Sequence, residues 1–319
     1  MTTQIIASAP GSIMITGEHA VVYGHPAMVC AIDQRITITA ERLTTRQLDI
    51  HSEIAAPYCV DFDALEVAGP YRFILAALAR YRDRIDHGVR LTVASAIDPT
   101  LGLGSSAAVT MASLGIFSHC AGQALDDKTR ARLHGDALAI IRAIQGRGSG
   151  ADLAASLYGG MISYQLPASM LTGVPQDGHG AAITALPAPP PLSLGYAGYK
   201  TPTGEVLAHI AKRMQGHEAQ YDALYKRMGH SAGEALTAAK AADHPVLARH
   251  LNDYQGLMVE LGVSDPVLDG LVQTARGTDG VLAAKISGSG LGECVLAMGG
   301  VPDGFAPAPL ATQGLQIDD

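Results

Sequence analysis

Apolar and polar residues alternate along much of the first hundred residues, which is the pattern of half-buried β-strands. In the segment RITITAE, for example, Ile36, Ile38 and Ala40 alternate with polar or charged residues. Residues 70–84 instead carry apolar side chains at helical spacing after a proline, and predict a helix with Phe73, Ala77, Leu78 and Tyr81 on one face. We expect strands at residues 4–10, 12–16, 27–32, 35–41 and 88–97.

The pattern becomes helical in the middle of the chain. Residues 105–122 and 127–145 each predict a helix, with no strand between them. In the second of these helices, one face carries Leu133, Ala137, Ile141 and Ile144. A glycine-rich connector at 146–152 then leads to a strand at 159–166.

Residues 167–191 are rich in Pro, Gly and Ala, and predict a connector between two domains, 1–185 and 186–319. After it we expect a strand at 192–199, three or four amphipathic helices, and a closing strand–loop–strand unit at 281–299. We expect about the last 19 residues to form a loosely held tail. The sequence therefore predicts an α+β fold of two domains.

Composition and charge narrow the class of protein. The chain has 319 residues, of which 48% are hydrophobic and 16% charged, as in a compact globular protein. A formal net charge of −8 argues against binding to nucleic acid or to an anionic membrane surface. The four scattered cysteines, the lack of a secretory signal and the lack of a membrane-spanning run indicate a soluble cytoplasmic protein.

The stretch PTLGLGSSAAVT, residues 99–110, is a glycine-rich loop that opens a predicted helix. Such a loop binds phosphate where bare backbone N–H groups meet the positive end of a helix. A dinucleotide fingerprint is disfavoured because the helix leads into another helix, and a Walker A loop is excluded because its lysine is missing. Two interpretations remain: glycines that serve packing alone, and a different nucleotide loop whose serine reaches Mg²⁺.

Two further glycine loops flank this one. In APGSIMITGEHAVVYG, residues 9–24, Glu18 and His19 stand side by side, and taken alone they also suit a solvated turn between strands. In KISGSGLGEC, residues 285–294, the loop joins two apolar strands, and taken alone it is an ordinary tight connection. It is the order and spacing of all three that is specific.

Taken together, the three motifs resemble those of the GHMP kinase family, in which an APGK…GEH segment, a P-x-x-x-G-L-G-S-S-A loop and a K-x-[ST]-G-[AS]-G loop follow in this order. Within the family, GEHAVVYG is most similar to the mevalonate kinases. The resemblance implies a ribosomal S5 domain 2-like N-terminal half and a ferredoxin-like C-terminal half, with ATP and substrate between them. It also implies that some members form homodimers.

The resemblance assigns roles to individual residues. It implies that Asp152, in QGRGSGADLAASLYGG, is the catalytic base, although Asp152 also suits a simple helix N-cap. It implies that Ser106 binds Mg²⁺ through its hydroxyl. The ATP phosphates would contact two loops, made of Gly102, Leu103, Gly104, Ser105, Ser106 and Ala107 and of Gly288, Ser289 and Gly290. The substrate would contact Glu18, His19, Lys200 and Thr203, the last two by a weaker match.

Two positions depart from the family pattern. The lysine of APGK is replaced by Ser12, and a serine does not supply a point charge. A magnesium-binding glutamate that mevalonate kinases carry about 11 residues before the aspartate is replaced by Ile141, with Asp136 the nearest acid. Candidates to supply the missing positive charge are Arg147, Lys200 and Lys285.

The resemblance implies phosphoryl transfer from ATP to a small-molecule hydroxyl, which depends mainly on positioning and charge stabilisation. We expect the acceptor to be the 5-hydroxyl of mevalonate, in isoprenoid synthesis. The alternatives are the same fold acting on phosphomevalonate or a sugar, and a non-catalytic descendant that binds a ligand or a protein partner.

Overall fold

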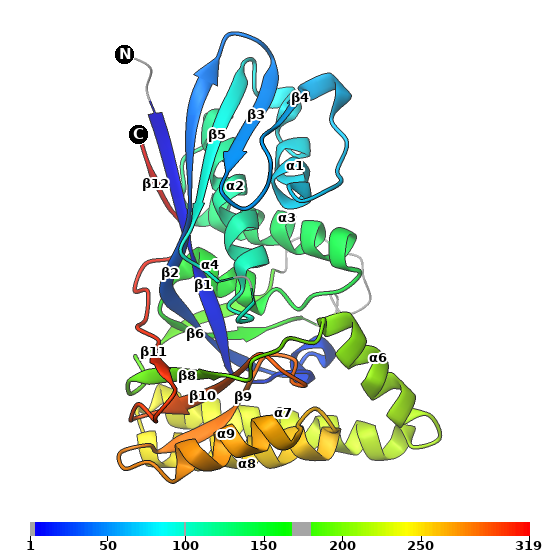
Figure 1. Cartoon of the computed structure of the whole chain (residues 1–319), viewed down its shortest axis with the longest axis vertical. Coiled ribbons are helices and arrows are strands. Elements are labelled where there is room, and N and C mark those ends of the chain that lie inside the picture. Colours follow the sequence, from blue (N-terminus) through cyan, green and yellow to red (C-terminus); the bar gives the residue numbers. More distant parts are fainter. Residues whose placement is uncertain (1–3, 99, 168–179) are drawn as a thin grey trace.

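The computed structural model describes residues 4–98, 100–167 and 180–319, and it contains two β-sheets with helices packed on one face of each (Figure 1). The larger sheet has strand order β12-β1-β2-β5-β3-β4. It is extended by β6, which pairs with β2, and by β7, which pairs with β6. Its strands are β1 (Gln4–Thr16), β2 (Ala27–Leu43), β3 (Gln47–Ser52), β4 (Tyr58–Asp61), β5 (Gly88–Ser95), β6 (Met161–Gln165), β7 (Ala182–Leu186) and β12 (Gln316–Asp318).

The first two strands are longer than the sequence predicts. The pairs of segments expected at 4–10 and 12–16, and at 27–32 and 35–41, are each one continuous strand. The antiparallel register of β1 and β2 shifts at Pro10/Gly11 and at Met14/Thr16. The first of these β-bulges stands where the sequence suggests a break in both strands, whereas the second lies within the strand expected at 12–16. The long strand β1 therefore passes the glycine loops of the candidate site without interruption.

In the described part of the chain, four helices cover one face of the larger sheet (Figure 1): α1 (Arg72–Ala79), α2 (Ser105–Cys120), α3 (Asp127–Gln145) and α4 (Ala151–Tyr158). The helix α2 is buried along most of its length, which explains why its sequence is apolar or small on all sides. As expected, α2 leads into α3 without a strand between them. The helix expected at 70–84 is shorter, because the α-helical part ends at Ala79 and a 3₁₀ turn follows.

The smaller sheet has strand order β11-β8-β10-β9, and all its pairs are antiparallel: β8 (Leu192–Tyr196), β9 (Ala283–Ser287), β10 (Cys294–Met298) and β11 (Ala306–Pro307). Of the three or four helices expected after the first strand of this half, the structure has four: α6 (Thr203–Met214), α7 (Glu218–Lys240), α8 (His244–Leu261) and α9 (Pro266–Arg276). A second apolar core lies between these helices and strands β9 and β10. The α+β class is thereby confirmed.

The C-terminal segment is not the loose tail that the sequence predicts. The chain returns from the smaller sheet to the larger one, where β12 pairs with β1 (Figure 1). Four of its apolar side chains are buried, namely Phe305, Ala308, Ala311 and Leu315. Their irregular spacing among prolines and glycines hides this burial from a periodicity argument. Much of the connector expected at 167–191 lies outside the described residues, but Ala182–Leu186 forms β7 against β6.

None of the described helices combines the length and apolar character needed to cross a membrane.

Candidate active site

The phosphate loop, residues 102–107, ends at the N-terminus of α2. Gly102 and Gly104 have φ angles of 71° and 68°, which favour glycine, and Gly104 is the N-cap of the helix. Among the described residues, no side chain caps the first turn of α2. Its backbone N–H groups and the positive helix end are therefore available to an anion.

The strand β1 packs closely against this loop. The Ser12 N–H donates to the Leu103 carbonyl over 3.0 Å, and a Cβ at Gly104 would lie 2.3 Å from Ser12 Oγ. A Cβ at Gly11 would lie 2.6 Å from the Leu103 oxygen, so the close approach of strand and loop requires glycine there too. Ser12 is buried under the loop, and its hydroxyl fills the space beside Gly104. The position that departs from the family pattern is thus a packing position in this chain.

Ser106, the expected metal ligand, lies in the first turn of α2, near the C-terminal end of α3. The Nε2 atom of Gln145 donates to Ser106 Oγ over 3.4 Å. The sequence analysis does not single out Gln145, because it follows the apolar face of α3 as an ordinary polar residue. The side-chain amide of Gln145 therefore orients the serine hydroxyl.

Asp152 is the second residue of α4, and Gly150, with φ of 86°, is the N-cap. The interpretation of Asp152 as the helix cap is therefore wrong. Two side chains fix the loop before it: His134 contacts the Gly150 carbonyl at 3.0 Å, and the Tyr164 hydroxyl donates to the Ser149 carbonyl over 2.6 Å. The rings of these two residues lie 5.7 Å apart, and the sequence analysis missed both.

Burial raises the pKa of Asp152 above its ordinary value, and the hydrogen bond from the Leu153 N–H to Asp152 Oδ1 opposes this shift. One turn along α4, Ser156 donates to the Pro10 carbonyl over 2.7 Å. Residues four apart share one face of a helix, so Asp152 lies on the side of α4 that faces β1. The phosphate loop and the helix that carries Asp152 thus both contact the short stretch of β1 from Pro10 to Ser12.

Glu18 and His19 follow the end of β1, and Glu18 is not the solvated residue that an exposed turn would give. Its Oε1 lies 2.5 Å from the Lys285 ammonium, and both side chains are almost fully buried. The Tyr254 hydroxyl donates to the Glu18 carbonyl over 2.7 Å. Lys285 is therefore committed to Glu18, and does not supply a free positive charge to the phosphate loop.

His19 adopts a left-handed backbone conformation with φ of 60°, and its Nε2 lies 3.0 Å from the Ser289 carbonyl. Burial lowers the pKa of His19 to about 4, helped by the Lys285 charge and opposed by this hydrogen bond. The imidazole is therefore neutral near pH 7, and it donates to the carbonyl from Nε2. This contact joins the GEH segment to the third glycine loop.

The third glycine loop, residues 288–293, contacts the phosphate loop through Glu293, which the sequence analysis missed. A Cβ at Gly102 would lie 2.6 Å from the Glu293 Cδ, and a Cβ at Gly288 would lie 2.5 Å from Glu293 Oε2. The ammonium of Lys200 lies 3.1 Å from Glu293 Oε1. The structure therefore brings Lys200 to the glycine loops, whereas Thr203 is an exposed residue at the start of α6.

The residue that replaces the family's glutamate and the nearest acid are engaged in packing and pairing. Ile141 is buried, and a Cβ at Gly148 would lie 2.8 Å from its Cγ2. The Asp136 carboxylate lies 3.5 Å from the guanidinium of Arg80, the residue that follows α1, and burial raises the pKa of Asp136. Within the described ranges, no group of three or more His, Cys, Asp or Glu side chains is placed to hold a metal.

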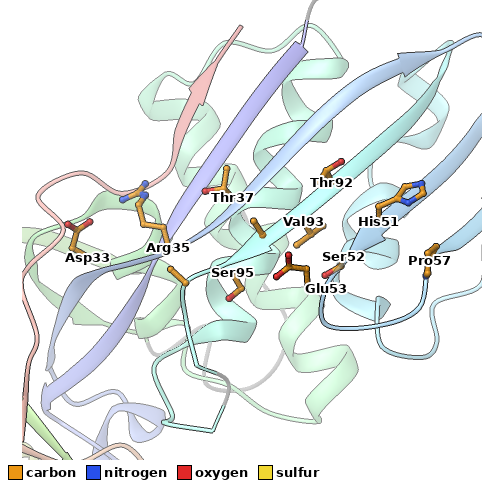
Figure 2. A pocket seen from close by; sticks show the side chains of 12 residues that line it. Asp33, Arg35, Thr37, His51, Ser52, Glu53, Pro57, Thr92, Val93 and Ser95 are labelled. Carbon is orange, nitrogen blue, oxygen red and sulfur yellow. The ribbon is translucent and has the colours of Figure 1, made fainter.

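A groove of about 750 Å³ lies elsewhere, over the face of the larger sheet opposite the helices (Figure 2). It is lined from β2, β3 and β5 by residues that include Arg35, Thr37, His51 and Thr92. None of the residues predicted for the site lines it. The groove is therefore separate from the glycine loops.

Three family models match the chain. GHMP kinases N terminal domain matches residues 72–160, and GHMP kinases C terminal matches 235–303. The galactokinase galactose-binding signature matches residues 2–42, which include the GEH segment. The N- and C-terminal models thus cover the phosphate loop, Asp152 and the third glycine loop.

Curated relatives align over nearly the whole chain. The mevalonate kinase of Pyrococcus furiosus is 31% identical, over 92% of this chain and 89% of its own. That of Thermococcus sibiricus is 30% identical over 99% of both chains. The phosphomevalonate kinase of a Streptomyces species is 27% identical, over 92% of this chain and 89% of its own.

Solved structures share the fold. The Lin0012 protein from Listeria innocua has a TM-score of 0.84 and 22% identity, covering 99% of this chain and 100% of its own. The Lactococcus lactis galactokinase complexed with galactose has a TM-score of 0.78 and 18% identity, covering 98% and 95%. The family models, the relatives at 30% identity or more and these structures agree, and the chain belongs to the GHMP kinases, a family of ATP-dependent small-molecule kinases.

Proposed function

We propose that this kinase transfers the γ-phosphoryl group of ATP to the 5-hydroxyl of mevalonate, in the cytoplasm, as a step of isoprenoid synthesis. The observation that carries the proposal is that the phosphate loop and α4, the helix that carries Asp152, contact the same stretch of β1. This arrangement suits a base and a phosphate cradle that act on one reaction centre. The mevalonate kinases that align over nearly the full chain support the choice of acceptor.

In this proposal the phosphates of ATP lie on the N–H groups of residues 102–107, and the glycines 288 and 290 with Ser289 close the site from the C-terminal half. Gly288 and Gly290 have φ angles of 96° and 81°, and a Cβ at Gly290 would lie 2.3 Å from the Val263 carbonyl oxygen. Both positions therefore require glycine for the loop to keep this backbone conformation.

A Mg²⁺ ion needs only one or two protein oxygens beside phosphate and water. The hydroxyl of Ser106, beside the Gln145 amide, fits this need, and the Asp152 carboxylate is a further hard oxygen donor. When bound with ATP, the ion neutralises charge on the phosphates. Ser106 would hold it, and Gln145 would orient the serine hydroxyl.

Asp152 is the proposed base that accepts the proton of the acceptor hydroxyl. Its raised pKa brings the carboxylate closer to the working pH, which favours proton transfer. The contacts of His134 and Tyr164 with the preceding loop hold this carboxylate in place.

Glu18 and His19 are proposed to bind the acceptor, with Lys200 and Thr203 approaching from the C-terminal half. Glu18 Oε2 and Ser289 Oγ are buried without a hydrogen-bond partner among the described residues. Buried polar atoms are rarely left unpaired, so a hydroxyl of the acceptor is a fitting partner for this edge of the site.

Two other acceptors, a sugar and phosphomevalonate, each have a specific observation in their favour. The galactose-binding signature covers residues 2–42, and a phosphomevalonate kinase aligns over 92% of the chain. The test is turnover of MgATP with mevalonate, phosphomevalonate, galactose and homoserine, with the product identified by mass. Phosphorylation of mevalonate alone supports the proposal, whereas turnover with another acceptor reassigns Glu18 and His19. Absence of turnover with all four contradicts the proposal.

A further inference from the structure

Glu293 has a backbone conformation that side chains rarely adopt. Its φ angle is 63°, in the left-handed region where glycine is favoured. Two hydrogen bonds to the segment that follows β8 hold this conformation, because the Glu293 N–H donates to the Tyr199 carbonyl and its own carbonyl accepts from the Ala197 N–H, both over 2.9 Å. A glycine would meet the backbone requirement at lower cost, so the side chain itself has a use.

The Glu293 carboxyl group occupies the space left by two glycines. It lies against Gly102 of the phosphate loop on one side and against Gly288 of the third loop on the other. The neighbouring Cys294 Sγ contacts the Leu101 carbonyl at 3.2 Å, which ties the same strand end to the phosphate loop. The carboxylate is buried, and it stands where a negative charge would repel phosphate if it were alone.

Lys200 balances this charge. Its ammonium lies 3.1 Å from Glu293 Oε1, and its side chain is 36% exposed while that of Glu293 is 8% exposed. An ammonium has three N–H donors, so one contact with Glu293 leaves donors for another anion. In contrast, Lys285 is buried against Glu18 and also donates to the Ile286 carbonyl.

We propose that Glu293 is a positioning residue that holds the Lys200 ammonium at the phosphate loop, where Lys200 binds a phosphate of the nucleotide. Lys200 then supplies the positive charge that Ser12 does not. The inference rests on nucleotide binding at residues 102–107, as in the proposed function, and refines the place of Lys200 from the acceptor side to the nucleotide side. It does not depend on the identity of the acceptor.

The test measures MgATP binding by titration calorimetry, without any acceptor, for the wild type, Lys200→Met, Glu293→Gln and the double variant. We expect each single variant to weaken binding on the order of tenfold, the loss of one directed charge contact. The double variant should bind no more weakly than Lys200→Met, because Glu293 acts only through Lys200. Steady-state kinetics should show the loss mainly in the KM for ATP.

Three outcomes would overturn the inference. Recovery of wild-type affinity in the double variant would mean that Lys200 only neutralises Glu293. Unchanged binding in Glu293→Gln would remove its positioning role. A higher Mg²⁺ requirement in Glu293→Gln alone would make Glu293 a metal ligand. If the wild type does not bind MgATP, the proposed function fails as well, so the two failures are distinguishable.

Two further variants keep the test interpretable. Glu293→Gly removes the carboxylate and relieves the left-handed conformation, so it should fold at least as well as the wild type and still bind MgATP more weakly. The pair Arg227→Met and Glu260→Gln removes an exposed ion pair of 2.7 Å between α7 and α8. This matched change of charge should leave MgATP affinity unchanged.

Discussion

The ammonium of Lys285 lies 2.5 Å from Glu18 Oε1, and the pair is buried between the end of β1 and strand β9. The same ammonium lies 5.5 Å from the centre of the Tyr254 ring. This contact joins the two halves of the chain at the third glycine loop. The GEH segment is thus held by the C-terminal half before any acceptor arrives.

Removing one partner of this pair should destabilise the protein strongly. Lys285→Met leaves a buried carboxylate without its counter-charge, and we expect a loss of about 3–5 kcal/mol in the free energy of unfolding. Urea denaturation followed by circular dichroism measures it. Arg227→Met, which breaks an exposed pair, should cost only about 0–1 kcal/mol. A similar small loss for Lys285→Met would show that the pair is solvated.

Asp152→Asn should lower turnover by about 10²–10⁴-fold, the usual contribution of a general base, while MgATP binding changes little. The substitution keeps the shape of the side chain and removes its ability to accept a proton. Steady-state turnover and titration calorimetry measure the two quantities. Near wild-type turnover would exclude Asp152 as the base.

The same substitution should stabilise the protein near neutral pH. Burial raises the pKa of Asp152 above 3.8 in the folded state, so ionisation of the carboxyl is less favourable there than in the unfolded chain. The stability associated with the protonated form is fully present below 3.8 and is lost as the pH rises through the folded-state pKa. Asp152→Asn does not ionise, so its Tm should exceed that of the wild type at pH 7 and approach it at low pH. Equal differences at both pH values would contradict this.

The pH dependence of turnover should follow Asp152 and not His19. Because the base must be ionised, the rate should fall as the pH drops through the raised pKa of Asp152. Burial lowers the pKa of His19 to about 4, so its imidazole stays neutral in assays near neutral pH. Replacing His19 with Gln should therefore weaken acceptor binding without moving the acidic limb of the kcat profile. A shifted limb in that variant would assign the titration to His19.

Local patterns predict most of the fold because they report burial directly. The alternation over Ile36, Ile38 and Ala40 gives β2, and the apolar face of residues 127–145 gives α3 with the expected bounds. Hydrophobic patterns do not predict structure where a segment is buried by contacts with residues that are distant in the sequence. The C-terminal strand pairs with β1 across almost the whole length of the chain, and nothing local in Gln316–Asp318 announces this partner.

The candidate site divides in the same way. Motif order and spacing identify the three glycine loops, since glycines in each loop adopt backbone conformations that other residues rarely take. They do not identify Gln145, His134, Tyr164 or Glu293, whose roles come from contacts made between elements. A positive φ at a non-glycine residue, as at Glu293, is visible only once the chain is folded.

Ser106→Ala should raise the concentration of Mg²⁺ that gives half-maximal turnover at fixed ATP. The substitution removes the hydroxyl oxygen next to Gln145 and leaves the backbone N–H groups of the loop in place, so the affinity for the phosphates should change less than that for the metal. A Mg²⁺ titration of the initial rate, with ATP binding measured separately, distinguishes the two effects. Ser113→Ala removes another hydroxyl from α2, one that donates to the Val109 carbonyl over 2.7 Å, and should leave the Mg²⁺ requirement unchanged. An unchanged requirement in Ser106→Ala as well would place the metal on other oxygens.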